Sequence, residues 1–307
     1  MTPWTGAPNR PGSGSRPAKR PGRALAAALL FAVLGACLLL MPADLGPPPA
    51  PPDAPRWVLT FDDEFDGAAL DAAKWTPARG YRPSREDVLD CYLPEQARLG
   101  GGELRLISAH RSVDGFRYVS GRVTTRGKFS QVYGRYEVCC RFPAASGIWP
   151  AVFLLPENGQ WPPEIDITEY IGRDPKTVYL TNHWRGPHGM HRQCNRNDYS
   201  PYEDWSAWHV YAVDWEPGSV RWYIDGRLVG ATPAGAGVSR QAMYLVANLD
   251  VGGSFAGPPD AARWPQEFDI DYIRVYQRAD RLRAARRMSA ANLGKTPPER
   301  PPRLLAP

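Results

Sequence analysis

Three carboxylates occur close together in the segment PPEIDITEY: Glu164, Asp166 and Glu169. The residues between them are isoleucine and threonine, which favour β-strands. Side chains two residues apart share one face of a strand, so Glu164 and Asp166 would lie together, whereas Glu169 would point to the opposite face. A β-bulge at Ile167 and Thr168 would add one residue and return Glu169 to the face of the other two. We therefore predict a bulged strand with three carboxylates on one face.

Two carboxyl groups on such a face can cleave a glycosidic bond. Side chains on one strand face repeat at about 7 Å, and a bulge can bring a pair to about 5 Å, the separation in retaining glycosidases. One group must stay ionised to attack the anomeric carbon, and the other must hold a proton for the leaving oxygen. We assign Glu164 as the nucleophile, Glu169 as the acid/base and Asp166 as the group that orients the nucleophile. The alternatives are a solvated strand face or a site for a hard cation, because carboxylates suit both.

Aromatic residues lie near this segment: Trp149, Phe153, Trp161 and Trp184. Pyranose rings present C–H groups to aromatic faces and hydroxyl groups to polar side chains, so such residues suit a carbohydrate site. Their alternative role is simple core packing.

Short alternating strands fill residues 56–277. Apolar and polar residues alternate in GGELRLISA (101–109), YGRYEVCCRF (133–142), HVYAVDWEP (209–217), SVRWYIDGRLVG (219–230) and FDIDYIRVYQ (268–277). The turn sequences EPGS and IDGR join the third and fourth of these segments into consecutive antiparallel strands. The sequence has no sustained helical period in this region and no internal repeat. It therefore predicts one all-β domain, a two-layer antiparallel β-sandwich of jelly-roll type.

These segments also resemble a known family. WPPEIDITEYIG is similar to the catalytic signature ExDxxE of glycoside hydrolase family 16, in the bulged form associated with laminarinase-like members and some that degrade marine galactans. Similar segments follow in the family's order: FDDEFDG (61–67) with Trp75, YGRYE (133–137), GIWPAVFLLP (147–156), HVYAVDWEPGSVRWYIDG (209–226), NLDVGG (248–253) and DIDYIRVY (269–276).

The resemblance implies a concanavalin A-like sandwich with a concave substrate cleft. It also implies hydrolysis of internal β-glycosidic bonds with retention of configuration, and no cofactor for catalysis. The match supports, position by position, the roles assigned to the three carboxylates. It places Trp149 and Trp161 in the cleft lining and His183, in NHW, near the scissile bond, with Asn248 as a further candidate.

The resemblance implies two more features. Family members often carry a structural calcium on the convex side, and the matching positions are Glu64, Gly102 and Asp271. The strand EVCCRF departs from the family pattern, because Cys139 stands where many relatives place a cleft arginine. The loss of that cation leaves the exact substrate open.

The segment HWRGPHGMHRQC offers a second metal hypothesis. His183, His188, His191 and Cys194 have spacings that could suit zinc. The segment is glycine-containing and loop-like, so the simpler interpretation is a mobile loop over the cleft.

The cysteines predict disulfides outside the cytoplasm. Cys139 and Cys140 point to opposite faces of a strand and cannot bond to each other. Cys91 would then pair with one of them and Cys194 with the other, since an oxidising location favours bridges.

The chain carries its basic charge at its two ends. The whole chain has a formal charge of +5, yet residues 56–277 hold 24 basic and 28 acidic residues. A nucleic-acid-binding domain would concentrate basic residues in its folded part, so we predict no nucleic-acid partner. The tail at 278–307 starts like a short basic helix and ends in proline-rich sequence, so we predict that it is basic and mostly disordered, a solubilising segment or one that adheres to anionic lipid or polymer.

The N-terminal region is typical of an exported protein. Residues 1–23 are basic and precede an apolar run at 24–41, long enough to span a bilayer as a helix and longer than the apolar core of most cleaved signals. LGAC, ending at Cys37, instead resembles a lipoprotein cleavage box. With the basic residues held in the cytoplasm, the proline-rich linker at 42–55 and the domain would lie outside it, either tethered or secreted.

We therefore expect a monomeric, extracytoplasmic endo-β-glycanase that acts on β-1,3- or mixed-linkage glucan or on an exopolysaccharide. Transglycosylation is a variant of this function, because a sugar hydroxyl can replace water in the second step. The alternative from another class is a lectin-like binder on the same fold. A binder does not need both Glu164 and Glu169.

Overall fold

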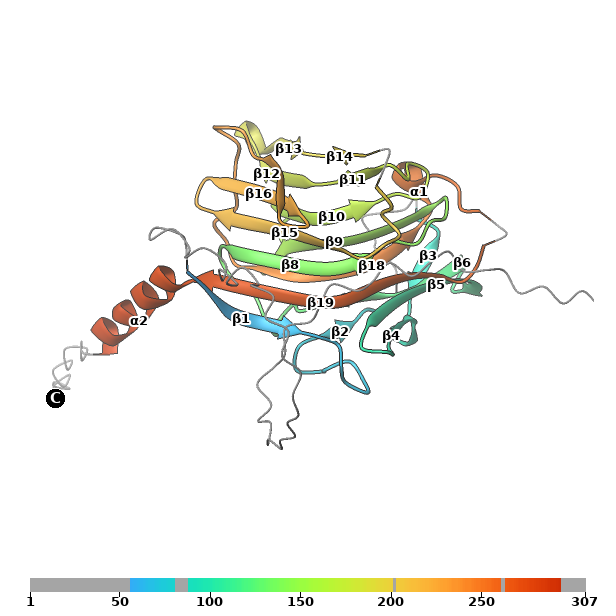
Figure 1. The fold of residues 1–307 in the computed structure, drawn as a ribbon, viewed down its shortest axis with the longest axis horizontal. Coiled ribbons are helices and arrows are strands. Elements are labelled where there is room, and N and C mark those ends of the chain that lie inside the picture. The colour runs from blue at the N-terminus through green and yellow to red at the C-terminus, as the bar shows by residue number, and fades with distance from the viewer. Residues whose placement is uncertain (1–55, 81–87, 201–202, 261–262, 294–307) are drawn as a thin grey trace, which may run out of the picture.

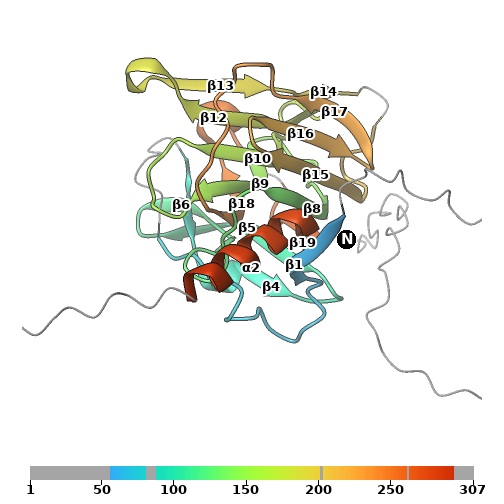
Figure 2. The ribbon, with the colours of Figure 1, turned by 90° about the vertical axis from the view of Figure 1, so that its left-hand side faces the viewer.

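Strands dominate the computed structural model, which describes residues 56–80, 88–200, 203–260 and 263–293. They form two sheets that pack face to face, as Figures 1 and 2 show. The all-β sandwich predicted from the alternating segments is confirmed. One pair, β3 with β6, is parallel, so the first sheet is mixed rather than wholly antiparallel.

The first sheet has the order β17-β16-β15-β8-β19-β5-β6-β3, with β1 beside β19 and β4 beside β5. Its strands are β1 (Trp57–Asp63), β3 (Asp90–Tyr92), β4 (Ala97–Leu99), β5 (Leu104–Val113), β6 (Phe116–Ser120), β8 (Gly134–Arg141), β15 (His209–Glu216), β16 (Ser219–Ile224), β17 (Arg227–Ala231) and β19 (Gln266–Arg278).

The second sheet has the order β13-β12-β10-β9-β18-β7-β2, with β11 beside β10 and β14 beside β11. Its strands are β2 (Thr76–Pro77), β7 (Arg122–Thr124), β9 (Ile148–Pro156), β10 (Glu164–Tyr170), β11 (Thr177–Tyr179), β12 (Thr181–Arg185), β13 (His191–Asn195), β14 (Asp198–Tyr199) and β18 (Met243–Val251). Four short or terminal helices complete the description: η1 (Pro94–Gln96), η2 (Pro187–Gly189), α1 (Gly253–Ala256) and α2 (Ala279–Leu293).

The core lies between the two sheets. Alternate residues of β8 and β15 face it, including Tyr136, Tyr211 and Trp215, all at most 1% exposed. The predicted hairpin from β15 to β17 is confirmed by the pairing of these strands. Its second turn contains Asp225 and Gly226 with φ of 49° and 77°, the positive values that a tight hairpin turn requires.

The C-terminal tail begins as a helix, as its sequence indicates, because β19 continues directly into α2, which projects from one end of the sandwich (Figure 1). Arg281 attaches the start of this helix to the first sheet. Its Nη2 donates to Glu216 at 2.9 Å, and its guanidinium lies 4.6 Å from the ring centroid of Tyr133. The proline-rich end of the tail, 294–307, lies outside the described residues.

The predicted anchor and linker, with the rest of residues 1–55, also lie outside the described part of the chain. Within the described ranges, no helix is both long enough and apolar enough to cross a membrane.

The predicted disulfides are absent. All four cysteines after Cys37 lie in the described part of the chain, and Cys91 and Cys194 are buried free thiols, so neither predicted bridge is formed. Their strands β3 and β13 are edge strands of different sheets, whereas Cys139 and Cys140 lie on the central strand β8.

The three positions matched to calcium belong to neighbouring segments of the first sheet. Asp63 pairs with Ile273 and Leu104 pairs with Ile270, so the end of β1 and the start of β5 flank the stretch of β19 that contains the buried Asp271. Glu64 is held by Arg274 at 2.7 and 2.8 Å, so a cation here would take the Asp271 carboxylate and backbone carbonyl oxygens. Such oxygen ligands fit Ca²⁺, which stays a prediction.

Candidate active site

A bulge in β10 brings the carboxylates to one face. Asp166 pairs with Phe153 and Thr168 pairs with Val152, so Ile167 is the extra residue. The core residues of the strand are accordingly 165, 167 and 170. An unbroken alternation would have buried Glu169 between the sheets. The predicted bulge is therefore confirmed at Ile167, and Glu164 and Glu169 both line the same cleft.

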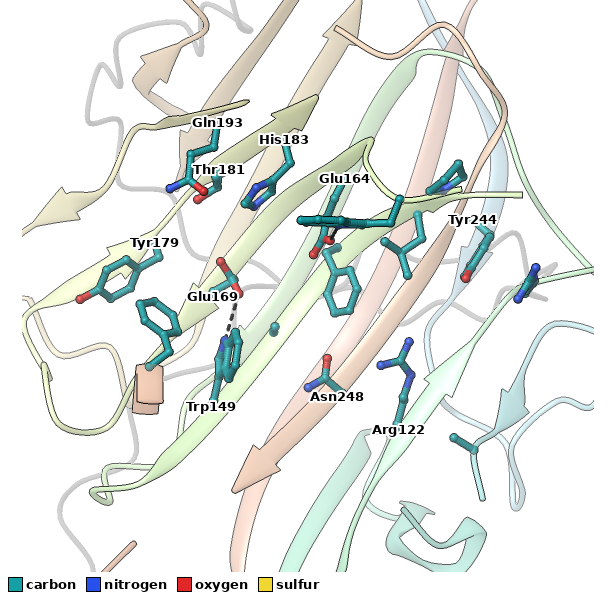
Figure 3. A pocket seen from close by; sticks show the side chains of 18 of the residues that line it. Arg122, Trp149, Glu164, Glu169, Tyr179, Thr181, His183, Gln193, Tyr244 and Asn248 are labelled. Atoms are coloured by element: carbon teal, nitrogen blue, oxygen red, sulfur yellow. Dashed lines mark hydrogen bonds between the residues drawn. The ribbon is translucent and has the colours of Figure 1, made fainter. Parts of the chain in front are cut away.

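The cleft lies on the outer face of the second sheet and has a volume of about 860 Å³. Figure 3 shows Glu164 and Glu169 extending into it from one strand. Residues of β12 and β13 line it on one side of the carboxylates, and residues of β18 and β7 line it on the other. A polymer could therefore run across the strands and past both carboxylates.

Glu169 is adapted to hold a proton. Desolvation by the surrounding protein, and then the nearby charges of Asp166 and Glu164, raise the pKa of Glu169 well above its usual value. The indole Nε1 of Trp149 donates a 2.9 Å hydrogen bond to Glu169 Oε1 and acts in the opposite direction, lowering the pKa. A carboxyl group with a raised pKa can serve as a general acid at neutral pH.

Asp166 is buried beneath the two glutamates at 1% exposure. Burial, and then the charge and hydrogen bonding of Glu164, raise the pKa of Asp166 well above its usual value. The backbone oxygen of Asp166 accepts a 2.8 Å hydrogen bond from Trp222 Nε1, which ties the bulge to the core. A protonated Asp166 can donate a hydrogen bond to Glu164 and orient it.

Two histidines connect Asp166 to the protein surface. His183 Nε2 lies 3.1 Å from Asp166 Oδ2, and His183 Nδ1 lies 2.9 Å from Nε2 of the exposed His191. Both ring nitrogens of His183 are therefore engaged. The predicted placement of His183 beside the carboxylates agrees with this geometry.

Glu164 has an aromatic partner of its own. Trp161 Nε1 donates a 2.5 Å hydrogen bond to Glu164 Oε2, although the Trp161 side chain is 48% exposed at the cleft edge. The backbone oxygen of Trp161 accepts a bond from Arg185 at 2.9 Å, and its ring packs 4.8 Å from that of His191. Each glutamate thus receives one indole N–H.

Comparison with known proteins identifies the family. Residues 90–274 match the model of glycosyl hydrolases family 16. The chain belongs to this family.

Individual relatives agree with that match. A β-glucanase from Rhodothermus marinus is 34% identical over 248 residues, which cover 73% of this chain and 86% of the relative. The X-ray structure of the laminarinase from Rhodothermus marinus has a TM-score of 0.66 at 33% identity and covers 74% of this chain and 99% of that one. EglC of Rhizobium meliloti, an endo-1,3-1,4-β-glycanase, is 34% identical over 241 residues, and the match spans 71% of this chain but 51% of the relative.

The aromatic residues predicted for this family 16 site divide into two groups. Trp149, Phe153 and Trp161 line the cleft, and so does Asn248. Trp184 does not, because it neighbours His183 on β12 and points to the opposite face, where Gly237 lies against its ring. Alternation along β12 could have indicated this from the sequence.

The cleft of this family 16 member contains arginines, although the sequence interpretation expected a cleft cation to be lost at Cys139. Cys139 does not occupy a cleft position, because β8 belongs to the opposite sheet and Cys139 is fully buried there. The cleft is lined instead by Arg79, Arg122 and Arg126. These residues lie in short edge segments whose alternation is too brief to reveal a face, so the sequence interpretation missed them.

The zinc hypothesis receives no support from the described residues, which contain no group of three metal-ligating side chains. His191 pairs with Arg185 in the hairpin of β12 and β13, and His188 is exposed at its turn. Cys194 is buried opposite Asn182. The segment predicted to be a mobile loop is therefore largely a β-hairpin.

Proposed function

We propose that the chain is a retaining endo-β-glycanase that hydrolyses internal bonds of β-1,3-glucan, mixed β-1,3/1,4-glucan or a related exopolysaccharide. The observation that carries the proposal is the bulge at Ile167, which presents Glu164 and Glu169 in one cleft and leaves Asp166 beneath them. The functions of these relatives, a β-glucanase and an endo-1,3-1,4-β-glycanase, support the same substrate class.

The reaction follows from the two environments. Glu164 attacks the anomeric carbon while Glu169 gives its proton to the departing glycosidic oxygen, and a glycosyl ester forms on Glu164. Glu169, now ionised, takes a proton from water, which attacks the same carbon and releases Glu164. The indole N–H groups of Trp149 and Trp161 hold the two carboxyl groups in position through both steps.

Endo action is supported by the shape of the cleft. Lining residues extend from Gln193 on β13 to Arg122 on β7, on both sides of the carboxylates. A polysaccharide can therefore occupy the cleft with units on either side of the scissile bond. A lectin would bind sugar without needing two carboxyl groups held this way, one of them with a raised pKa.

We also propose that the domain acts outside the cytoplasm, tethered or secreted through residues 24–41. Support comes from the apolar run itself and from the basic residues before it. Fractionation of cells that express the full chain would test this location, and recovery of the protein only from the cytosol would contradict it.

Release of reducing ends from laminarin and lichenan tests the proposed activity. Glu164→Gln and Glu169→Gln should each reduce kcat by about 10³-fold or more, because each removes a reacting group. Products must retain the β-configuration when they are first formed. Unchanged release by both variants, or inversion of configuration, would reject the proposal.

A further inference from the structure

The helix α2 begins where the proposed tether enters the domain. Antiparallel pairing places Trp57, the first residue of β1, opposite Arg278, the last residue of β19. The backbone N–H of Ala279, at the start of α2, donates a 2.8 Å hydrogen bond to the backbone oxygen of Arg56. Figure 1 shows α2 leaving the sandwich beside β1. The chain that precedes Arg56 therefore joins the domain at the base of α2.

The charge of the domain is distributed unevenly between its body and this helix. Residues 56–277 hold 24 basic and 28 acidic residues, whereas residues 278–293 hold five arginines and one aspartate. The body would be repelled by an anionic surface, and the helix would be attracted to one. The distribution therefore favours one orientation of the domain on such a surface, with α2 toward it.

The first arginines of the basic segment fix the helix to the domain. Arg278 pairs with Asp280 at 3.0 Å, and this pairing uses the only acidic residue in the sequence of α2. Arg281 pairs with Glu216 of the first sheet at 2.9 Å. These contacts leave α2 attached at its base and set its direction away from the sheet.

The next arginines have no such use within the protein. The side chains of Arg283 and Arg287 are exposed, and neither has an acidic partner among the residues that the structure describes. Because they are four residues apart on a helix, they lie on one face and repel each other, and an anionic surface would relieve that repulsion. Ala284 and Ala285, exposed between them, are too small to bury much apolar area in acyl chains. Charge is therefore the main attraction that this face offers.

The strand β1 adds apolar surface beside the base of the helix. Among the described residues five large apolar side chains are exposed, and two of them, Val58 at 41% and Leu59 at 48%, are adjacent on β1. They follow Arg56 by two and three residues. Apolar side chains that enter the interfacial layer of a bilayer strengthen electrostatic adsorption. This end of the domain thus combines the two components of binding to an anionic bilayer.

The proposed tether selects a membrane, rather than a free polymer, as the anionic surface. Residues 42–55, predicted to be extended, would span about 43 Å, and the 15 residues of α2 extend about 22 Å. The helix therefore stays within reach of the surface that holds the tether. Such attachment raises the effective concentration of that surface, and a polymer in solution has no comparable advantage.

We propose that α2 binds the anionic phospholipid headgroups of the membrane that holds the tether, through Arg283 and Arg287. The inference rests on the proposed tether at 24–41 and goes beyond the proposed activity. The helix continues β19 of the first sheet, whereas the cleft lies on the outer face of the second sheet. Binding through α2 therefore leaves the cleft uncovered and open to polysaccharide outside the cell.

The test inserts the full chain into two kinds of vesicle, phosphatidylcholine alone and phosphatidylcholine with about 30% of the anionic lipid phosphatidylglycerol. Mass spectrometry measures hydrogen exchange of the backbone amides of residues 279–287. Exchange in the wild type should be slower in the anionic vesicles by about 25-fold, or about 5-fold for each of two arginines near an anionic surface. The difference should disappear in about 0.5 M salt, because salt screens charge.

Two double variants make the test specific. Arg283→Gln with Arg287→Gln should give nearly equal exchange in the two kinds of vesicle. Arg111→Gln with Arg117→Gln removes the same charge from exposed positions on β5 and β6, far from α2 in Figure 1, and should keep the wild-type difference. Both double variants should hydrolyse laminarin at the wild-type rate, because none of the four arginines lines the cleft.

The outcomes separate the inference from the proposals on which it rests. Equal exchange of the wild type in both kinds of vesicle overturns the inference. Equal slowing by soluble polyglutamate also overturns it, in favour of an anionic polymer as the partner. Absence of laminarin hydrolysis rejects the proposed activity and leaves the exchange result standing. If the full chain does not float with the neutral vesicles, the tether is rejected, and anionic vesicles added to the soluble protein still decide whether α2 binds lipid.

Discussion

Trp149 and Glu169 are joined by a 2.9 Å hydrogen bond from the indole Nε1 to Oε1, and this bond opposes the burial that raises the pKa of Glu169. Removing the donor with Trp149→Phe should therefore raise the pKa of Glu169 further. A general acid loses activity as pH rises through its pKa, so the alkaline limb of the kcat/KM profile should move to higher pH. The maximum rate should fall as well, because the carboxyl group loses an orienting contact.

The pH profile on laminarin checks this prediction, with Trp208→Phe, in the loop just before β15 of the opposite sheet, as the control. An alkaline limb that stays in place or moves to lower pH would show that the hydrogen bond does not set the pKa of the acid.

Replacing Asp166 should stabilise the fold at high pH and reduce activity. Burial and Glu164 raise the pKa of Asp166 in the folded state. The protonated carboxyl group therefore contributes its full stability below the pKa of the unfolded chain, and this contribution is lost as pH rises through the pKa of the folded state. Asp166→Asn keeps the hydrogen-bonding shape without the ionisable group. We expect the Tm of this variant to exceed that of the wild type at about pH 8, and the gain should shrink toward about pH 4.

Thermal unfolding across this pH range measures the effect. Asp280→Asn changes an exposed carboxylate whose pKa is lowered by Arg278, so it should give no gain at high pH. An Asp166→Asn variant less stable than the wild type at pH 8 would mean that the ionised side chain contributes favourably to the fold. Activity should fall in this variant, because an asparagine side chain cannot exchange a proton with Glu164.

His191 should act as a positioning residue through His183. It lies 2.9 Å from His183 Nδ1, and removing it leaves the ring that contacts Asp166 without its second partner. His191→Ala should lower kcat by about 3- to 10-fold with little change in KM or Tm, because polar networks at such sites are cooperative. His191→Gln, which retains a donor and an acceptor, should recover most of the rate.

His188→Asn supplies the comparison for this series. His188 is exposed in the same hairpin and has φ of 58°, a conformation that asparagine tolerates. Equal losses of kcat in the His188 and His191 variants would indicate a general effect of the hairpin rather than the contact with His183.

The parts of the site that lie on long, regular strands could be predicted from the sequence. Alternation places Glu164 and Asp166 on one face, and only the chemical use of Glu169 demanded a bulge, which pairing later located at Ile167. Cys139 was misplaced because its cleft position was taken from the family resemblance, whereas β8 belongs to the sheet opposite the cleft. Arg122 was missed because β7 has three residues, too few for a pattern, and its exposure to the cleft depends on its neighbour β18.

The disulfide prediction failed for a related reason. Cysteine number and compartment limit which pairings are possible, but spatial proximity decides which one forms. Cys91 and Cys194 lie on strands at the outer edges of different sheets, and β8, which carries the adjacent pair, is central in the first. Long-range strand order is not encoded in local patterns.

Calcium should stabilise the domain at the junction of β1, β5 and β19. Asp271 is buried on β19 between the segments that pair with β1 and β5, and oxygen ligands of this kind prefer Ca²⁺ to Mg²⁺ when the geometry is flexible. At a Ca²⁺ concentration about 100 times Kd, binding adds roughly 2.7 kcal/mol to the free energy of unfolding, which should raise Tm by several degrees.

The measurement is the Tm of the domain in EDTA, in excess Ca²⁺ and in excess Mg²⁺. Asp271→Asn should lose most of the Ca²⁺ response, whereas Asp269→Asn, which alters the partner of Arg141 on the same strand, should keep it. A wild-type Tm that does not respond to Ca²⁺ would contradict the prediction that Asp271 is part of a calcium site.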